Sequence, residues 1–241
     1  MQTVKILNLT KSFGKIRAVD SLSLDIEKGK ITGLIGADGS GKTTLIRLIT
    51  GLLIPDSGEI TVLGLNPAAQ KEELSTKIGY MPQKFGLYED LSIEENLQLY
   101  ADLKKLPYEF DELLEFTKLM PFKTRLAGAL SGGMKQKLGL ACALMGTPEF
   151  LVLDEPSVGV DPIPRRDLMK MVKDLISPQT TVLWSTAYLD EAHSFDTAIV
   201  LDKGKVIYNG SPHSLAATAP EFEDKVIELM GGYKKEESLI A

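Results

Sequence analysis

The amino-acid sequence predicts an α/β fold in which strand-forming segments near both ends of the chain flank a mainly helical middle. Short apolar runs bounded by turn residues, at 31–35 and 150–153, are typical of buried strands. From about residue 92 to residue 146 the apolar residues instead recur at helical spacing. The chain has 241 residues, of which 44% are hydrophobic and 25% charged, which is enough for one well-cored domain.

The N-terminal part is predicted to be β-structure. Apolar residues are spaced through a mostly polar run at 4–9, and they alternate with polar residues at 22–26, which is the period of a half-buried strand. A turn at 28–30 leads into the apolar strand 31–35, and turn residues at 54–58 precede another strand. The same patterns predict further strands at 59–63, 78–81, 150–153, 181–185, 198–202 and 206–208, and helices at 44–50, 111–119, 134–144 and 165–176.

The middle of the chain carries a helix-start signal. Ser92 followed by Glu95 fits a capping box, in which the two residues satisfy backbone N–H groups at a helix N-terminus. Because this helical stretch interrupts the α/β pattern, we expect a helical subdomain inserted at about 84–147 in a domain that spans 1–225. Residues 226–241 are expected to form a C-terminal tail or linker.

Charge, cysteine content and hydropathy narrow the possible classes of function. A net charge of −6 argues against a general nucleic-acid binder. Cys142 is the only cysteine, which leaves no disulfide framework and suits a reducing compartment. No stretch approaches the roughly 18 apolar residues of a membrane-spanning helix. If the protein acts at a membrane, a partner is therefore expected to do the spanning.

A phosphate-binding motif lies between a predicted strand and a predicted helix. The run Gly36-Ala37-Asp38-Gly39-Ser40-Gly41-Lys42-Thr43 fits the pattern G-x-x-x-x-G-K-[ST], and Thr44 continues it into the helix. The glycines let backbone N–H groups turn toward an anion, and the helix N-terminus favours phosphate. We expect Lys42 to reach the β- and γ-phosphates of ATP and Thr43 to bind Mg²⁺. Asp38 would repel phosphate, so we expect it to face outward.

A second motif is an apolar strand that ends in two carboxylates, Phe150-Leu151-Val152-Leu153-Asp154-Glu155. In isolation such a strand is usually structural, but the phosphate-binding run favours a catalytic interpretation. Asp154 is then expected in the Mg²⁺ shell. Glu155 is expected to orient or deprotonate the attacking water. These motifs predict an ATPase whose ligands are ATP and Mg²⁺.

A third motif, Leu130-Ser131-Gly132-Gly133, opens a helix with a serine and two glycines. In the simplest interpretation, Ser131 is a helix N-cap. The same arrangement is also a second anion-binding helix N-terminus. One chain does not need two such sites for one ATP, so we expect Ser131, Gly132 and Gly133 to bind the ATP held by another subunit.

With these three motifs in this order, the sequence resembles the ATP-binding subunits of ABC transporters over nearly its whole length. It is most similar to bacterial multidrug-type exporter ATPases and to the first half of those with two ATPase domains in one polypeptide. The resemblance implies a P-loop NTPase core with a mixed sheet, an N-terminal antiparallel β subdomain and the inserted helical subdomain. It also implies partners: integral membrane permease subunits and a second ATPase domain, identical, different or fused, at the cytoplasmic face of the cell membrane.

The resemblance assigns roles to three more residues. It implies that Gln83 contacts Mg²⁺ or water and couples the ATP site to the membrane partner. It implies that Phe13 stacks on adenine, although a core phenylalanine is an alternative interpretation. Asp161 closes the segment 157–161, which the family places at the interface between two ATPase domains. No nucleic-acid partner is expected.

One position departs from the family pattern. The family places a histidine that contacts the γ-phosphate after the strand ending at 185, where this chain has Ala187. A methyl group cannot donate a hydrogen bond. His193 is expected on the surface of the next helix, and His213 carries no motif. Either the replacement is neutral or engineered, or the chain's own site is degenerate, with slow turnover beside a faster partner.

Two other functions stay open at this point. One is a soluble ABC-type ATPase acting on nucleic acid or ribosomes, which the acidic charge and the compact helical insert disfavour. The other is an ATP-gated clamp with little turnover, which Glu155 disfavours and Ala187 favours mildly. Export is favoured over import by the resemblance alone, and the cargo path would lie in the membrane subunits.

Overall fold

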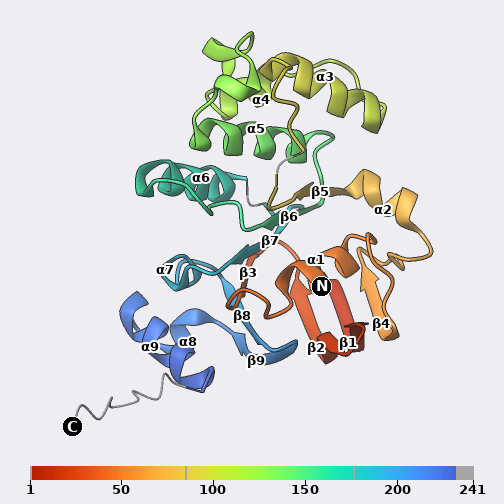
Figure 1. Cartoon of the computed structure of the whole chain (residues 1–241), viewed down its shortest axis with the longest axis vertical. Helices are drawn as coiled ribbons and strands as arrows, with labels where there is room; N and C mark the ends of the chain where they lie inside the picture. Colours follow the sequence, from red (N-terminus) through yellow and green to blue (C-terminus); the bar gives the residue numbers. More distant parts are fainter. Residues whose placement is uncertain (1, 85, 176, 232–241) are drawn as a thin grey trace.

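A small antiparallel sheet forms the N-terminal part of the fold. The computed structural model describes residues 2–84, 86–175 and 177–231 (Figure 1). The small sheet has the order β2-β1-β4 and consists of β1 (Gln2–Phe13), β2 (Ile16–Glu27) and β4 (Ser57–Val62). Buried and exposed residues alternate along the second half of β2, because one face of the sheet packs on the core. The expected N-terminal antiparallel subdomain is therefore confirmed.

The central sheet is mixed, as expected. Its order is β5-β6-β7-β3-β8-β9, and each neighbouring pair is parallel except the last, in which β9 runs antiparallel to β8. Its strands are β3 (Ile31–Ile35), β5 (Ile78–Met81), β6 (Phe150–Asp154), β7 (Thr181–Thr186), β8 (Thr197–Asp202) and β9 (Lys205–Gly210). The register pairs Asp154 with Ser185 and Ile35 with Thr186. The carboxyl ends of β3, β6 and β7 therefore meet at one edge of the sheet.

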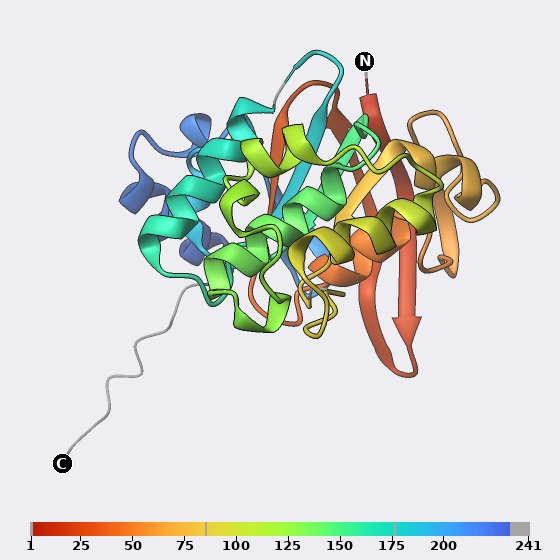
Figure 2. The same ribbon diagram turned by 90° about the horizontal axis from the view of Figure 1, so that it is seen from above.

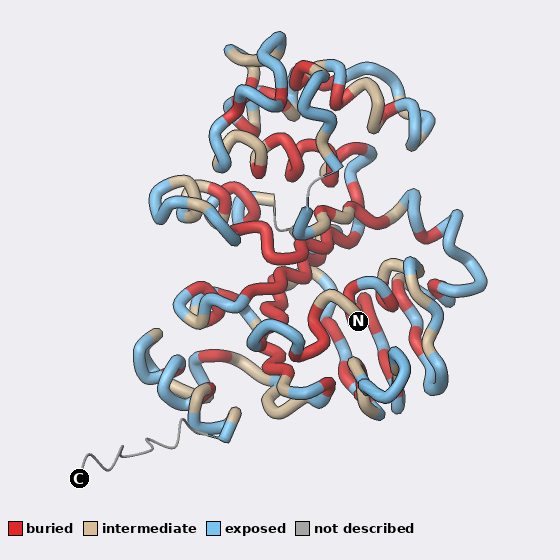
Figure 3. Tube along the Cα trace, viewed as in Figure 1, coloured by how far each residue is buried: buried red, intermediate tan, exposed pale blue. Residues whose placement is uncertain are grey.

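Two layers of apolar residues sandwich this sheet. Phe150 and Val152 of β6 point to one face, where α1 (Lys42–Ile49) and the small sheet pack. Leu151 and Leu153 point to the other face, toward α6 (Pro162–Asp174). Figure 3 shows the resulting column of buried residues along the centre of the molecule. Burial on both faces explains why these strands read as continuous apolar runs.

The helices between β5 and β6 form a layer with a core cluster of its own. They are α3 (Ile93–Lys104), α4 (Asp111–Phe116) and α5 (Gly132–Leu144), with 3₁₀ turns at Met120–Phe122 and Ala127–Ala129. Seen from above, they lie together in front of the strands (Figure 2). Ser92 caps α3, and the expected capping box with Glu95 is present in both directions. These elements lie inside the range 84–147 expected for the helical insertion.

The structure extends and corrects several predicted elements. The helix α2 (Lys71–Lys77) was not predicted, because Leu74 is its one buried residue and no periodicity results. The short helix α8 (Pro212–Leu215) was also missed, whereas the helix expected after Ala187 is present as α7 (Leu189–Ala192) and ends directly before His193. Among the described residues no helix is both long and apolar enough to span a bilayer.

The expected tail boundary at residue 226 falls inside a helix. The helix α9 (Ala219–Leu229) begins with a capping box formed by Thr218 and Glu221, and its Phe222 and Val226 are fully buried. Residues 226–229 are thus a packed part of the domain, because their helix contributes to the core beside α7. The rest of the expected tail, from 232 to 241, lies outside the described residues, as do Phe85 and Ile176.

Candidate nucleotide site

The loop that carries the phosphate-binding motif runs from the end of β3 to α1, and packing dictates two of its glycines. A Cβ on Gly36 would lie 2.4 Å from Ser40 Oγ, and one on Gly41 would lie 2.2 Å from the Ala18 carbonyl oxygen. Gly41 also has a φ of +110°, which L residues avoid. Gly39 has a positive φ too, but open space surrounds it. The turn is therefore built so tightly that side chains are excluded from its inner positions.

Segments far apart in the sequence clasp this loop. The Gly204 N–H donates to the Ser40 carbonyl (2.9 Å), and the Gly204 carbonyl accepts from the Asp20 N–H (2.9 Å). Asp20 lies in β2, and Gly204 lies in the turn between β8 and β9. Within the loop itself, Ala37 and Asp38 are exposed, so Asp38 faces outward as expected. Thr44, in the first turn of α1, is half-buried.

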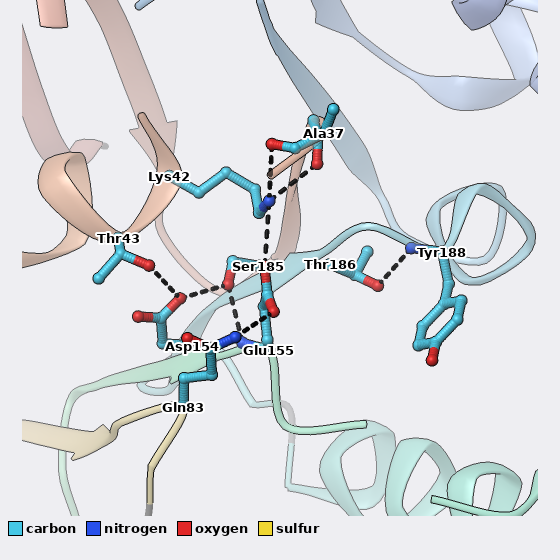
Figure 4. A network of polar contacts seen from close by, with 10 residues as sticks. Ala37, Lys42, Thr43, Gln83, Asp154, Glu155, Ser185, Thr186 and Tyr188 are labelled. Atoms are coloured by element: carbon cyan, nitrogen blue, oxygen red, sulfur yellow. Dashed lines mark hydrogen bonds and ion pairs between the residues drawn. The ribbon is translucent and has the colours of Figure 1, made fainter. Parts of the chain in front are cut away.

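Lys42 joins the loop to the strand that ends in two carboxylates. Its side chain is almost completely buried, and its ammonium donates to the Gly36 carbonyl (2.8 Å) and the Ala37 carbonyl (3.2 Å). The same Nζ lies 3.1 Å from Glu155 Oε1 (Figure 4). A buried cation surrounded by oxygen acceptors at the N-terminus of α1 is suited to exchanging these partners for phosphate oxygens.

Asp154 has the features expected of a cation ligand. Its Oδ1 accepts hydrogen bonds from Ser185 Oγ (2.8 Å) and Thr43 Oγ1 (3.3 Å). Its Oδ2 is buried and has no hydrogen-bond partner among the described residues. Burial raises the pKa of Asp154, and the hydrogen bonds from Ser185 and Thr43 oppose that rise. A carboxylate oxygen without a hydrogen-bond partner, next to a threonine hydroxyl, offers two oxygen ligands of the kind that Mg²⁺ prefers.

Glu155 is held in a strained position at the same edge. Its φ of +51° lies in the left-handed region, which is rare for a residue with a side chain. Its backbone N–H donates to Ser185 Oγ (2.8 Å), and its Oε2 accepts from Gln83 Nε2 (2.7 Å). The structure therefore brings together Lys42, Thr43, Gln83, Asp154 and Glu155 (Figure 4).

Ser185 is the residue of this cluster that sequence reasoning missed. It is fully buried at the end of β7, donates to Asp154 and accepts from Glu155. In the sequence, the only indication of its role is that a hydroxyl residue stands at the carboxyl end of a predicted apolar strand. The pairing of β7 with β6 is a long-range contact that the sequence pattern did not reveal, so the signal could not be used.

Other predicted residues lie elsewhere. Ser131 caps α5 by accepting from the Met134 N–H (3.4 Å), and both Ser131 and Gly132 are exposed. None of the hydrogen bonds around Glu155 among the described residues includes Ser131, Gly132 or Gly133. Asp161 is exposed at the N-terminus of α6.

Phe13 lies at the end of β1 and is 50% exposed, with the Lys11 ammonium 5.8 Å from its ring centroid. The alternative interpretation of Phe13 as a core residue is therefore wrong. An exposed ring beside a cation is a surface on which a base can stack.

Neither histidine takes the place that Ala187 leaves. Ala187 is exposed and follows directly on β7. His193 is half-buried rather than on the surface, because its ring packs against His213 (centroids 4.4 Å apart) and Phe222 (6.0 Å). Tyr188 points away from Lys42 and Glu155 (Figure 4).

The chain belongs to the ABC transporter family, whose family model matches residues 19–158. Its fold agrees with a solved ATP-binding subunit of an ABC transporter, with a TM-score of 0.82, 26% identity and coverage of 94% of this chain and 99% of that one. The ADP conformation of MJ1267, an ATP-binding cassette, gives a TM-score of 0.81 and 30% identity, and covers 96% of this chain and 99% of that chain.

Among curated proteins, the chain is similar to the probable multidrug ABC transporter ATP-binding protein YbhF of Escherichia coli K12. The two are 54% identical over 206 residues, which is 83% of this chain and 36% of that protein's length. The Nod factor export ATP-binding protein I of Rhizobium sp. strain N33 is 35% identical over 240 residues, covering 97% of this chain and 78% of that protein. The chain thus spans only about a third of the first relatives it matches, at 36% and 30% of their lengths.

Proposed function

We propose that this chain binds and hydrolyses ATP with Mg²⁺ and, paired with a second ATPase domain, powers export through separate membrane permease subunits. The observation that carries the proposal is the buried contact of Lys42 with Glu155 (3.1 Å), with Gln83 bound to the same carboxylate. Export is supported by the printed names of relatives, one called multidrug and one called Nod factor export. The working position is the cytoplasmic face of the cell membrane.

Each residue at the carboxyl ends of the central strands has its own role in the proposed hydrolysis of ATP. Lys42 neutralises the β- and γ-phosphates, and the phosphates take it away from Glu155. Glu155, freed on one oxygen and still bound to Gln83 on the other, orients the attacking water and accepts its proton. Asp154 and Thr43 would hold Mg²⁺, which neutralises charge on the phosphate oxygens when it is bound.

The surface of Ser131, Gly132 and Gly133, of which the first two residues are exposed, completes the ATP site of a second domain in this proposal. Its support is the position of these residues at the N-terminus of α5 and the fact that they share no hydrogen bond with the cluster around Glu155. Phe13 stacks on adenine, and Asp161 lies between the two domains. Each chain then contributes half of two sites.

The chain's own site turns over slowly in this proposal, because Ala187 supplies no donor to the γ-phosphate. Removing one transition-state donor costs about 10²–10³ in rate. The test is single-turnover hydrolysis by the wild type and by Ala187→His, with Ala68→His, an exposed alanine far along the chain, as the matched control. A faster Ala187→His with an unchanged control supports the degenerate site, and equal rates for all three contradict it.

The test of the whole proposal combines turnover with assembly. We expect Mg²⁺-dependent ATP hydrolysis by the purified chain, and its loss in Glu155→Gln with nucleotide binding retained. We also expect ATP to convert Glu155→Gln from monomer to dimer in light scattering. Co-purification of a membrane permease supports transport, whereas co-purification of nucleic acid or ribosomes points to the soluble ABC-type ATPases. Tight ATP-dependent dimers without ATP hydrolysis by the wild type or by any variant would indicate an ATP-gated clamp.

A further inference from the structure

Glu191 is a buried carboxylate outside the cluster described above. It lies in α7, four residues after Ala187, and only 7% of its surface is exposed. Its Oε2 accepts a buried hydrogen bond from the indole Nε1 of Trp184 (3.3 Å), which lies in β7. Arg165 of α6 places its Nε 3.6 Å from Oε1. A carboxylate this deeply buried is retained only where several groups stabilise it.

Two hydroxyls from functional loops face the same carboxylate. Thr186 directly precedes Ala187, and Ser157 begins the segment 157–161, which follows β6 and Glu155. Burial raises the pKa of Glu191, and the Thr186 and Ser157 hydroxyls, followed by Arg165 and Trp184, oppose that rise. Neither hydroxyl donates a hydrogen bond to Glu191, so both are neighbours of the carboxylate and not its bound partners.

Two atoms at this junction lack a hydrogen bond and are complementary. Ser157 Oγ and Glu191 Oε1 are both buried, and neither has a hydrogen-bond partner among the described residues. One can donate and the other can accept. A hydrogen bond between them would satisfy both atoms, and buried polar atoms strongly favour being paired.

The segment 157–161 is also held from its other side. Gln136 of α5 is buried, and its Nε2 donates to the Val158 carbonyl (3.3 Å). Its helix is the one that Ser131 caps. The segment therefore lies between the helix of the Ser131–Gly132–Gly133 surface and the helix that carries Glu191.

The residues around Ala187 are anchored to α6 as well. The Arg165 guanidinium lies 4.7 Å from the Tyr188 ring centroid and 2.6 Å from Asp190 Oδ2. The Tyr188 N–H donates to Thr186 Oγ1 (2.9 Å). The residues on both sides of Ala187 are therefore held in place. Thr186 and Tyr188 are joined by a hydrogen bond, and Tyr188 packs on Arg165, which also lies beside Glu191.

We propose that Glu191 is a positioning residue whose carboxylate fixes the loop carrying Ala187 against the segment 157–161. Through Gln136, the segment transmits movement of the Ser131 surface to the sheet edge that holds Glu155. Glu191 touches no reacting atom in this proposal. It rests on the proposed function, because the movement it transmits is that of ATP-driven pairing.

The fluorescence of a single tryptophan can test the positioning role of Glu191. Trp184 is the only tryptophan, and its indole donates to Glu191. We expect ATP to change the fluorescence of Trp184 in the wild type and expect Glu191→Gln to lose most of that change. Glutamine keeps the size of the side chain and an acceptor for the indole, but it removes the charge that faces Arg165. The matched control is Glu73→Gln, the same change of side chain in the exposed helix α2, where it removes an ion pair with Lys77 (4.0 Å) and touches neither α5, α6 nor α7.

Turnover gives the second readout. A misplaced reacting group costs up to about 10²-fold in rate, so kcat of Glu191→Gln should fall by about tenfold or more while KM changes little. Ser157→Ala, which removes only a hydroxyl, should lower kcat in the same direction, and the double variant should show less than the product of the two effects. Glu191→Ala should be slower than Glu191→Gln, since alanine leaves no acceptor.

The outcomes separate the two proposals. A wild type that neither hydrolyses ATP nor responds to it in fluorescence contradicts the proposed function. If the wild type responds and both Glu191→Gln and Ser157→Ala match Glu73→Gln in kcat and in fluorescence, the positioning role of Glu191 is wrong. Melting temperatures show whether a variant is folded, and Ser157→Ala keeps the test decisive if Glu191→Gln is not.

Discussion

At the scale of single residues, the ATP site depends on competition for Lys42. Its ammonium is shared between two loop carbonyls and Glu155, and each of these oxygens is a poorer partner than a phosphate group. In the proposed reaction, arrival of phosphate therefore releases Glu155 at the moment when a base is needed. The positive φ of Glu155 keeps its carboxylate aimed at this place instead of along the strand.

Two glycines of the phosphate loop should respond differently to the same change. Gly41→Ala combines a φ of +110° with a Cβ 2.2 Å from the Ala18 carbonyl oxygen, so the loop must move. Gly39→Ala meets open space and bears only backbone strain of about 1–2 kcal/mol, or about tenfold in affinity. We expect Gly41→Ala to weaken nucleotide binding by about 100-fold or more. Titration with a fluorescent ATP analogue checks this, and equal losses for both variants would contradict it.

The orphaned carboxylate of Asp154 should destabilise the chain when nucleotide and metal are removed. Its folded-state pKa is raised above the ordinary value of 3.8, so the folded chain binds more protons than the unfolded chain just above that pH. The stability contributed by Asp154 therefore falls as pH rises from 3.8 through its raised pKa. Asp154→Asn lacks this penalty and should melt at a higher temperature than the wild type near neutral pH in EDTA.

The control for this comparison is the pH itself. The advantage of Asp154→Asn should shrink as pH falls toward 3.8, where the wild-type carboxyl is protonated. Adding Mg²⁺ and ATP should reverse the order, because only the wild type keeps the cation ligand. An advantage that is the same at every pH would show that Asp154 is not the titrating group.

At the scale of elements, the inner strands of the central sheet were predictable because they are buried on both faces and bounded by turns. The motifs expected to bind ATP could be found because the residues of each are contiguous in the sequence. Ser185 and Glu191 were not, since they meet the site only through the pairing of β6 with β7 and the packing of α7. The helix α9 was missed although Thr218 and Glu221 carried a capping signal that could have revealed it.

The correction at the C-terminus makes a stability prediction. Phe222 of α9 is fully buried, so Phe222→Ala should lower the free energy of unfolding by about 3–5 kcal/mol. Leu229 lies on the same helix but is 43% exposed, and Leu229→Ala should cost less than about 1.5 kcal/mol. Urea denaturation of both variants checks this, and a Phe222→Ala as mild as Leu229→Ala would show that α9 is not part of the domain core.

At the scale of the whole molecule, the phosphate loop and the Ser131 surface belong to one rigid chain but serve different sites in the proposed pair. Two defective chains should therefore repair each other. Lys42→Ala cannot hold ATP, and Ser131→Arg blocks the surface that completes a partner's site. Each should be inactive alone, whereas an equal mixture should recover about a quarter of the activity, since half of the dimers are mixed and each has one intact site of two.

The control for this mixture is the double variant, Lys42→Ala with Ser131→Arg, mixed with Ser131→Arg. It should recover nothing, because no pair then combines an intact phosphate loop with an intact Ser131 surface. If the first mixture also stays inactive while the wild type hydrolyses ATP, copies of this chain do not complete one another's sites.

The clasp around the phosphate loop has a consequence for how the chain folds. Gly204 contacts both Ser40 and Asp20, so the loop takes its shape only when an N-terminal hairpin and a C-terminal hairpin have both docked on it. Contacts between segments so distant along the chain form late, because closing long loops costs entropy before any contact compensates for it. Competence to bind nucleotide should therefore be among the last properties acquired during folding, after most secondary structure. A ribosome-bound chain that has not yet released residue 204 would carry the complete motif and still be unable to use it.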